Sequence, residues 1–257
     1  EEDLPDQINT AIDFDRDFVP VTAVDPGPDG VPGTGDDGTI TVFNQIDNIG
    51  VNDLVLTNVA DKETDYKGVE MVVRRRFADN WQMQAALTLG SSEGPVAAGG
   101  NSADQSGTSG IFTTPNGRIN AFGKLAWDRP YVFKLSGSYL LPADVLVAGV
   151  LRSQSGLPVA RTFTVSEAAD GTPLGQGSVT VPAFPRGEER LDAVTTIDLR
   201  AGKEFELGPG RLGVYGDLFN LTNENTITGI ANTGAAFGTP TGILGPRLFR
   251  LGFRYEF

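Results

Sequence analysis

The chain has 257 residues, of which 39% are hydrophobic, carries a net charge of -13 at pH 7, and contains neither Cys nor His. Disulfide bonds and thiol catalysis are therefore excluded, the commonest general base and metal ligand is missing, and the acidic balance argues against nucleic-acid binding. No run of about 18 apolar residues is present, so the sequence predicts no transmembrane helix. The 33 glycines and 16 prolines favour many turns over long helices.

The first segment, 1–65, is acidic and irregular. It holds 16 Asp and Glu against two Lys and Arg, whereas charge in the remainder is close to balanced. Pro and Gly prevent regular structure over 25–38 (DPGPDGVPGTGDDG), and a short strand is predicted over 39–45. No basic, apolar signal peptide begins at the first residue, so we expect a mature product or a piece of something longer. We therefore divide the chain into an acidic, loop-rich segment, 1–65, and a strand-rich segment, 66–257.

From residue 66 the pattern changes to alternation. Apolar and polar residues alternate over 66–77 (YKGVEMVVRRRF), and the alternation resumes over 81–90 (WQMQAALTLG). A period of two is typical of a strand with one apolar and one polar face. The polar residues 78–80 between them make a three-residue connection of hairpin length.

The same alternation recurs along the rest of the chain. Further strands are predicted over 131–141, 145–153, 194–207 and 211–220. Short turns at 142–144 and 208–210 join them in pairs. With the strand at 39–45 and one at the C-terminal end, the alternation predicts about eight strands.

The last eleven residues, 247–257 (RLFRLGFRYEF), show the strongest alternation. Five large apolar side chains share one face: Phe249, Leu251, Phe253, Tyr255 and Phe257. A strand of a soluble sandwich can show this pattern, but it rarely carries five such groups on one face. A transmembrane barrel strand, apolar toward lipid and polar toward the lumen, fits better.

Short turns alternate with long loops, which lie over 91–120, 156–191 and 222–245. Outer-membrane barrels have this asymmetry, with short periplasmic turns and long outer loops. A soluble barrel more often keeps both ends short. The sequence therefore predicts an all-β fold, an antiparallel transmembrane β-barrel with long extracellular loops.

The candidate metal site is the Asp-rich loop. Its carboxylates are Asp25, Asp29, Asp36 and Asp37, which are hard oxygen ligands of the kind that Ca2+ prefers. Their spacing does not match an EF-hand loop. The alternative is a solvated acidic loop, and a third interpretation is binding of divalent ions that bridge lipopolysaccharide.

Charged residues within the strands divide between the two faces. Six have the opposite parity to their apolar neighbours and are predicted to face the lumen: Asp198, Arg200, Glu204, Asp217, Arg250 and Arg254. A hydrogen-bonded wall is the simpler interpretation, and a role in substrate passage is the alternative. Arg75 instead shares the lipid-side parity close to a turn, where Arg reaches head groups. No nucleophile–base pair or phosphate-binding loop is found, so we expect no catalytic residues.

Six stretches carry a resemblance through their order and spacing. They are 65–94, 116–142 (NGRINAFGKLAWDRPYVFKLSGSYLLP), 152–162 (RSQSGLPVART), 185–207, 210–226 (GRLGVYGDLFNLTNENT) and 245–257 (GPRLFRLGFRYEF). In these stretches the chain resembles TonB-dependent outer-membrane receptors, in particular the Oar-like group. The resemblance covers the chain from about residue 65 to its end.

The resemblance implies a barrel of about 22 strands with an N-terminal plug domain inside it. It implies import of scarce, large nutrients with energy passed from the inner membrane through a TonB-type periplasmic partner. It also implies that Phe257, with Tyr255 and Phe253, is the signal read by the barrel assembly machinery. Strands of about 9–11 residues cannot give about 22 strands in this length, and no plug or partner-binding box precedes them. We therefore expect the C-terminal part of such a barrel.

Our leading hypothesis is a part of a TonB-dependent transporter in the outer membrane of a Gram-negative cell, contributing barrel wall and outer loops. Its expected partners are outer-membrane lipid and lipopolysaccharide, the rest of the barrel and plug, and the TonB-type protein, and they do not include nucleic acid. A structural or accessory barrel component without transport is the alternative. A soluble calcium-binding β domain is a third hypothesis, and Ca2+ is the one cofactor considered.

Overall fold

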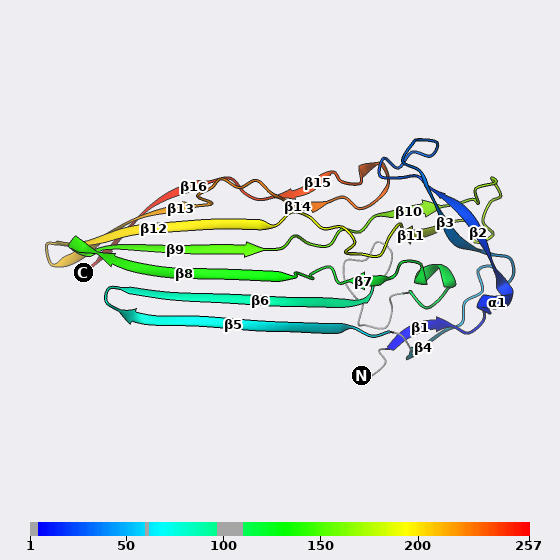
Figure 1. Ribbon diagram of the computed structural model, residues 1–257, viewed down its shortest axis with the longest axis horizontal. Helices are drawn as coiled ribbons and strands as arrows, with labels where there is room; N and C mark the ends of the chain where they lie inside the picture. Colours follow the sequence, from blue (N-terminus) through cyan, green and yellow to red (C-terminus); the bar gives the residue numbers. More distant parts are fainter. Residues whose placement is uncertain (1–4, 60–61, 97–109) are drawn as a thin grey trace.

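One antiparallel sheet dominates the computed structural model, which describes residues 5–59, 62–96 and 110–257 (Figure 1). Its strands are β5 (Asp65–Ala78), β6 (Trp81–Pro95), β7 (Phe122–Lys124), β8 (Tyr131–Leu141), β9 (Val145–Gln154), β12 (Val194–Leu207), β13 (Gly210–Phe219) and β16 (Leu248–Glu256). They lie in the order β16-β13-β12-β9-β8-β6-β5, and β7 pairs with the end of β6. We call these eight strands the wall sheet. The predicted all-β, antiparallel fold is confirmed.

The wall sheet is open. Within the described residues, the edge strands β5 and β16 do not pair with each other. The closure and size of a barrel therefore stay predictions. No helix in the described ranges is long and apolar enough to cross a membrane.

Three tight turns gather at one end of the wall sheet, where the chain also ends (Figure 1). Ala78 pairs with Trp81, so only Asp79 and Asn80 form the first turn, one residue fewer than the sequence predicted. Their φ angles of 52° and 67° are the two positive values that a type I′ turn requires. The other turns are η2 (Pro142–Asp144) and a turn at Gly208, which has a φ of 60°.

Small sheets occupy the opposite end. They are β1 (Pro5–Asn9) with β4 (Leu54–Asn58), β2 (Phe18–Asp25) with β3 (Gly38–Gln45), β10 (Thr162–Val165) with β11 (Val179–Pro182), and β14 (Ile227–Ile230) with β15 (Pro240–Ile243). The helices α1 (Phe14–Asp17), η1 (Pro115–Arg118) and η3 (Gly234–Ala236) lie between them. We call residues 5–58, 110–121, 157–191 and 221–246 the loop cap.

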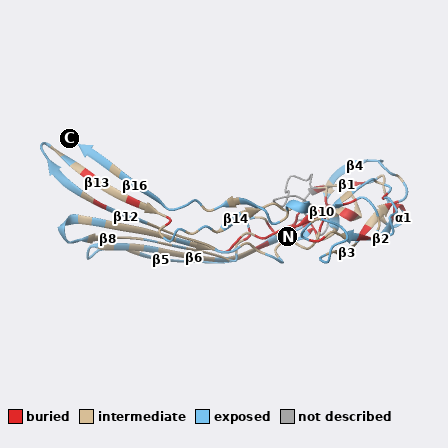
Figure 2. Ribbon diagram, turned by 90° about the horizontal axis from the view of Figure 1, so that it is seen from above, coloured by how far each residue is buried: buried red, intermediate tan, exposed pale blue. Residues whose placement is uncertain are grey.

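The loop cap has a hydrophobic core of its own. Its largest cluster of buried residues is Ala23, Val42, Phe163, Val165, Leu174 and Val181. Ala23 and Val42 come from the acidic segment 1–65, whereas the other four come from a loop more than a hundred residues later. Figure 2 shows that buried residues gather at this end, while the wall sheet is mostly intermediate or exposed, with a few buried positions such as those on β12 and β13. The core therefore ties the first segment to the later loops.

Most strands of the loop cap were not predicted from the sequence. Only β3 was predicted, over 39–45, and the other seven small strands lie in segments read as irregular or as loops. Most have four or five residues, too short for alternation to stand out. The strand predicted to end at residue 90 also continues to Pro95. Of the loop predicted over 91–120, residues 97–109 lie outside the described residues.

Candidate functional site

The register of the wall sheet sorts its side chains onto two faces, because residues directly opposite in neighbouring strands share a side. One row crosses the sheet through Met83, Gly137, Gly149, Leu199, Leu218 and Phe249. The next row toward the tight turns runs through Trp81, Tyr139, Val147, Ala201, Gly216 and Leu251. We call this side the apolar face.

Large side chains on the apolar face are exposed instead of buried. Val69 is 59% exposed, Phe249 65% and Phe253 67%. A soluble monomer rarely shows a contiguous apolar surface of this extent, and such surfaces mark interaction sites with membranes or proteins. The wall sheet therefore lacks the cover that a soluble domain would place over this face.

The opposite, polar face carries an ionic cluster centred on Asp217. Asp217 lies directly between Arg200 and Arg250 in the register of β12, β13 and β16. Its Oδ2 accepts from the Arg200 Nη2 at 3.1 Å and lies 2.8 Å from the Arg250 Nη2. The Asp217 side chain is only 6% exposed, so two guanidinium groups compensate a nearly buried carboxylate.

The other residues predicted to face a lumen lie on the same polar face. Asp198 accepts a hydrogen bond from the backbone N–H of Asn220 at 2.9 Å. Glu204 accepts one from the hydroxyl of Tyr215 at 3.3 Å, and Arg254 forms an ion pair with Glu256. The register thus brings all six charged residues to one side. That this side lines a lumen stays a prediction.

Arg75 lies on the apolar face beside the first tight turn. Its guanidinium stands 4.1 Å from the centre of the Trp81 ring, and its Nη2 is 2.8 Å from the Asp79 carboxylate. A cation over an aromatic ring is stabilised by the ring quadrupole. This arrangement holds a positive charge at the margin of an apolar surface.

The C-terminal aromatics extend the apolar face to the end of the chain. Phe253 is 67% exposed, Tyr255 is 45% exposed, and Phe257 is fully exposed. The Tyr255 hydroxyl donates to the Leu207 carbonyl at 3.1 Å, and its ring centre lies 6.2 Å from that of Phe257. Their role as an assembly signal stays a prediction.

The Asp-rich loop is the connection of the β2–β3 hairpin, and it does not gather its four carboxylates. Both Asp25 oxygens bind Arg161, at 2.7 and 2.6 Å. Asp36 and Asp37 accept from the Thr34 hydroxyl, at 2.6 and 3.3 Å, and the Thr34 hydrogen bond lowers the pKa of Asp36. Asp29 accepts from a nearby backbone N–H at 2.8 Å. In the described ranges, no three acidic residues are arranged to hold a metal. The calcium site stays a prediction that this geometry does not support.

Three buried ion pairs in and below the loop cap were missed by the sequence interpretation, and one of them joins Lys62 and Asp6 at 3.1 Å. Arg161 is 9% exposed, binds Asp25 in a bidentate geometry, and donates to the Gly27 carbonyl at 2.9 Å. Asp128 is 1% exposed, pairs with Arg190, and accepts from a backbone N–H of β6. The Arg161–Asp25 partners are 136 residues apart in the chain, and the Arg190–Asp128 partners are 62 residues apart. No local pattern in the sequence signals such a pairing.

Another buried carboxylate, Asp17, organises the start of β2. It accepts from the Arg16 Nε at 2.6 Å, the Asn48 amide at 3.0 Å and the Asp13 backbone N–H at 2.9 Å. The Arg16 hydrogen bond, followed by those from Asn48 and Asp13, holds the pKa of Asp17 well below its usual range. Asp17 therefore favours its ionised form in the folded cap.

Comparison with known proteins gives likenesses to solved structures alone. No protein-family model matches the chain, and no curated protein matches it. The crystal structure of the ferric-catecholate import receptor Fiu from E. coli K12, in its closed form, superposes with a TM-score of 0.45 at 16% identity. The superposition covers 85% of this chain and 25% of the receptor, so the chain spans about a quarter of that receptor's length. At this level of similarity the likeness assigns neither a family nor an activity.

Proposed function

We propose that the chain is the C-terminal part of the barrel of a TonB-dependent transporter in the outer membrane, and that this transporter imports a scarce nutrient. The observation that carries the proposal is the two-faced wall sheet, with exposed apolar side chains on one side and an ionic network on the other. A membrane strand needs an apolar face toward lipid, and a wide aqueous lumen accepts a charged face.

The asymmetry of the two ends supports the same proposal. Tight turns lie at one end, and the loop cap lies at the other (Figure 1). Outer-membrane barrels place short turns in the periplasm and long loops outside the cell. The loop cap would then face the medium, where ligand capture begins.

The open edges of the wall sheet indicate what this segment needs from the rest of the barrel. β5 and β16 each have a strand neighbour on one side only within the described ranges. Lipid cannot satisfy a row of unpaired backbone groups, so strands outside these residues must continue the wall on both sides. On this proposal the plug domain and the TonB-type energising protein act through the complete receptor.

The transport proposal is tested genetically in the source organism. Strains lacking this protein, the energising protein or both are grown with scarce nutrients supplied one at a time at limiting concentration. We expect a growth defect confined to one class of nutrient. Because both proteins would act in one process, growth on that nutrient should be no worse in the double deletion than in the strain that lacks only the energising protein.

The alternative is a structural or accessory barrel component of an envelope complex. It shares the two-faced sheet but predicts a different phenotype, in which the deletion weakens the envelope to detergent and no nutrient-specific defect appears. That outcome would contradict transport while leaving the membrane location intact.

A soluble calcium-binding β domain is the third candidate, and the Asp25–Arg161 pair weakens it. Calorimetric titration of the protein with Ca2+ tests it directly, with Asp36→Asn as the control variant. Absence of heat at millimolar Ca2+ would remove this candidate. Heat that is lost in the control variant would support it.

A further inference from the structure

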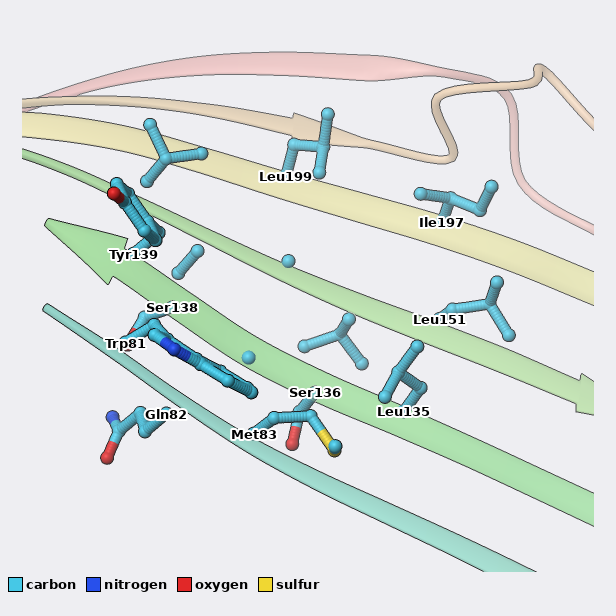
Figure 3. Close-up of a pocket in the computed structure, with 15 residues that line it drawn as sticks. Trp81, Gln82, Met83, Leu135, Ser136, Ser138, Tyr139, Leu151, Ile197 and Leu199 are labelled. Carbon is cyan, nitrogen blue, oxygen red and sulfur yellow. The ribbon is translucent and has the colours of Figure 1, made fainter. Parts of the chain in front are cut away.

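A hollow of about 600 Å³ lies on the apolar face, across β6, β8, β9 and β12 (Figure 3). The hollow is shallow and open, so it would cover a ligand from one side only. The large apolar and aromatic side chains that line it include Trp81, Met83, Leu135, Tyr139, Leu151 and Leu199. They belong to the apolar face, so the hollow is lined for an apolar ligand.

Two glycines create the hollow. Gly137 and Gly149 lie directly opposite each other in β8 and β9, between Met83 and Leu199 in the same row. Neither has a positive φ, so the backbone does not demand glycine at these positions. A Cβ atom on Gly149 would lie 3.1 Å from a terminal methyl carbon of Leu199, which can rotate away. A Cβ atom on Gly137 would lie 3.0 Å from the Gln82 backbone oxygen, so only the Gly149 position could accept a side chain without a backbone shift.

The hollow runs from the level of the aromatic rings into the apolar band. Trp81 and Tyr139 face each other across β6 and β8 in the row nearer the tight turns. Leu135, Leu151 and Ile197 line it farther from the turns. Trp and Tyr rings prefer the boundary between lipid head groups and acyl chains. The end nearer the turns therefore lies at head-group level, and the other end lies among acyl chains.

The strand residues beside the hollow carry positive charge, and the adjoining turns carry the carboxylates Asp79 and Asp144. In the turn-side half of the apolar face, the charged strand residues are Arg75 and Lys203, which lie on opposite sides of the hollow. The Arg75 guanidinium is stacked on Trp81, which lines the hollow, and the Lys203 Nζ is 5.2 Å from the centre of the Phe205 ring. Asp79 in the turn pairs with Arg75 at 2.8 Å, and no acidic side chain of the strands opposes either cation on this half of the face.

We infer that the hollow holds an acyl chain of an anionic phospholipid from the leaflet at the tight-turn side, with the lipid phosphate beside Arg75. This inference rests on the proposed function, because a lipid reaches this face only when the wall sheet lies in a membrane. The cations at head-group level favour a lipid over an apolar segment of another protein, which would gain nothing from them.

The test uses the intrinsic fluorescence of Trp81. The chain has two tryptophans, and Trp127→Phe leaves Trp81 as the reporter. The protein is reconstituted in phosphatidylcholine bilayers that contain a small fraction of brominated phosphatidylglycerol or, in parallel, brominated phosphatidylcholine. Bromine quenches only in contact with the ring. One cation near a membrane surface favours an anionic lipid about fivefold. Half-maximal quenching should therefore need about fivefold less brominated phosphatidylglycerol than brominated phosphatidylcholine.

Matched variants separate the acyl-chain contact from the charge contact. Gly149→Val should fill the hollow and abolish the selective quenching. Gly216→Val is the control on the same face, because its Cβ would lie an ordinary 3.6 Å from the Phe249 ring. Arg75→Gln should remove the preference for the anionic lipid and keep the quenching itself.

The outcomes distinguish this inference from the proposed function. Equal quenching by both lipids in every variant, or selective quenching that survives Gly149→Val, would overturn the inference and leave the hollow to a protein partner. Absence of quenching by either lipid at any fraction would contradict the membrane location, and with it the proposed function.

Discussion

The loop cap and the wall sheet place their apolar side chains differently. Phe163 in the cap strand β10 is 5% exposed, whereas Phe253 in the wall strand β16 is 67% exposed. The cap buries one set of apolar groups in a core of its own, as a protein does in water, while others such as Ile46 and Leu56 stay exposed. The wall sheet leaves them outward, which is stable where the surroundings are apolar. The difference indicates two solvents along one molecule.

The two regions also differ in how they hold together. Three of the six pairings along the wall sheet are tight hairpins, and the other three join strands across longer connections, so the strand order follows the sequence. The cap joins segments that are far apart, through the shared core and the Arg161–Asp25 pair. The following changes test this contrast in order of decreasing expected effect.

Arg161→Met should damage the cap alone. It leaves the mostly buried Asp25 carboxylate without its cation. The cost should approach the loss of about 3–5 kcal/mol seen for fully buried pairs, reduced by the hydrogen bond that remains from the Gly27 N–H. Hydrogen exchange should then show lost protection in β2, β3, β10 and β11, with the β8–β9 hairpin unchanged.

Asp25→Leu combined with Arg161→Met is the control for that experiment, because replacing both partners removes the unpaired charge. The double variant should recover much of the lost protection. Equal damage in the single and double variants, or loss of protection in the wall sheet, would contradict separate stabilisation of the two regions.

Leu135→Arg tests the wall sheet, where Leu135 lies on the apolar face of β8. An Arg on the lipid side of a barrel costs about 2–4 kcal/mol at the middle of the membrane. Ser136→Arg places the same charge one residue along, on the polar face, and should cost much less. Denaturant unfolding in lipid vesicles measures both, and equal costs would count against a lipid-facing surface.

Much of the wall sheet could be predicted from the sequence, because alternation with period two survives wherever one face is apolar and the other polar. The six charged residues share a face for the same reason. The Gly137–Gly149 pair could not be predicted, since it depends on the register between two strands. Arg161 and Asp25 are brought together by the folding of the whole cap, and their sequence neighbourhoods show no sign of it. Small strands such as β10 and β11 lack the length for a periodic signal.

Acidification gives the smallest expected effect, and it acts on the cap through Asp17. The pKa of this carboxyl is lowered in the folded cap, first by the Arg16 hydrogen bond and then by that from Asn48. Its stabilising contribution is therefore present above the unfolded pKa of about 3.9 and is lost as pH falls below that value. Protection of β2 against hydrogen exchange, corrected for intrinsic rates, should therefore hold down to about pH 5 and fall as the pH drops from there toward about 2. Asp17→Asn should show less of this fall, and an unchanged fall would exclude Asp17 as its source.

The central claim is that the apolar face of the wall sheet lies in lipid, and spin labels along β16 test it most directly. The chain contains no Cys, so single Cys variants from Phe249 to Tyr255 can be labelled without background. In bilayers, collision with oxygen should peak at the odd positions on the apolar face, and collision with a water-soluble nickel chelate should peak at the even positions between them. Nickel collision that is high at every position, or oxygen collision without a period of two, would contradict the account.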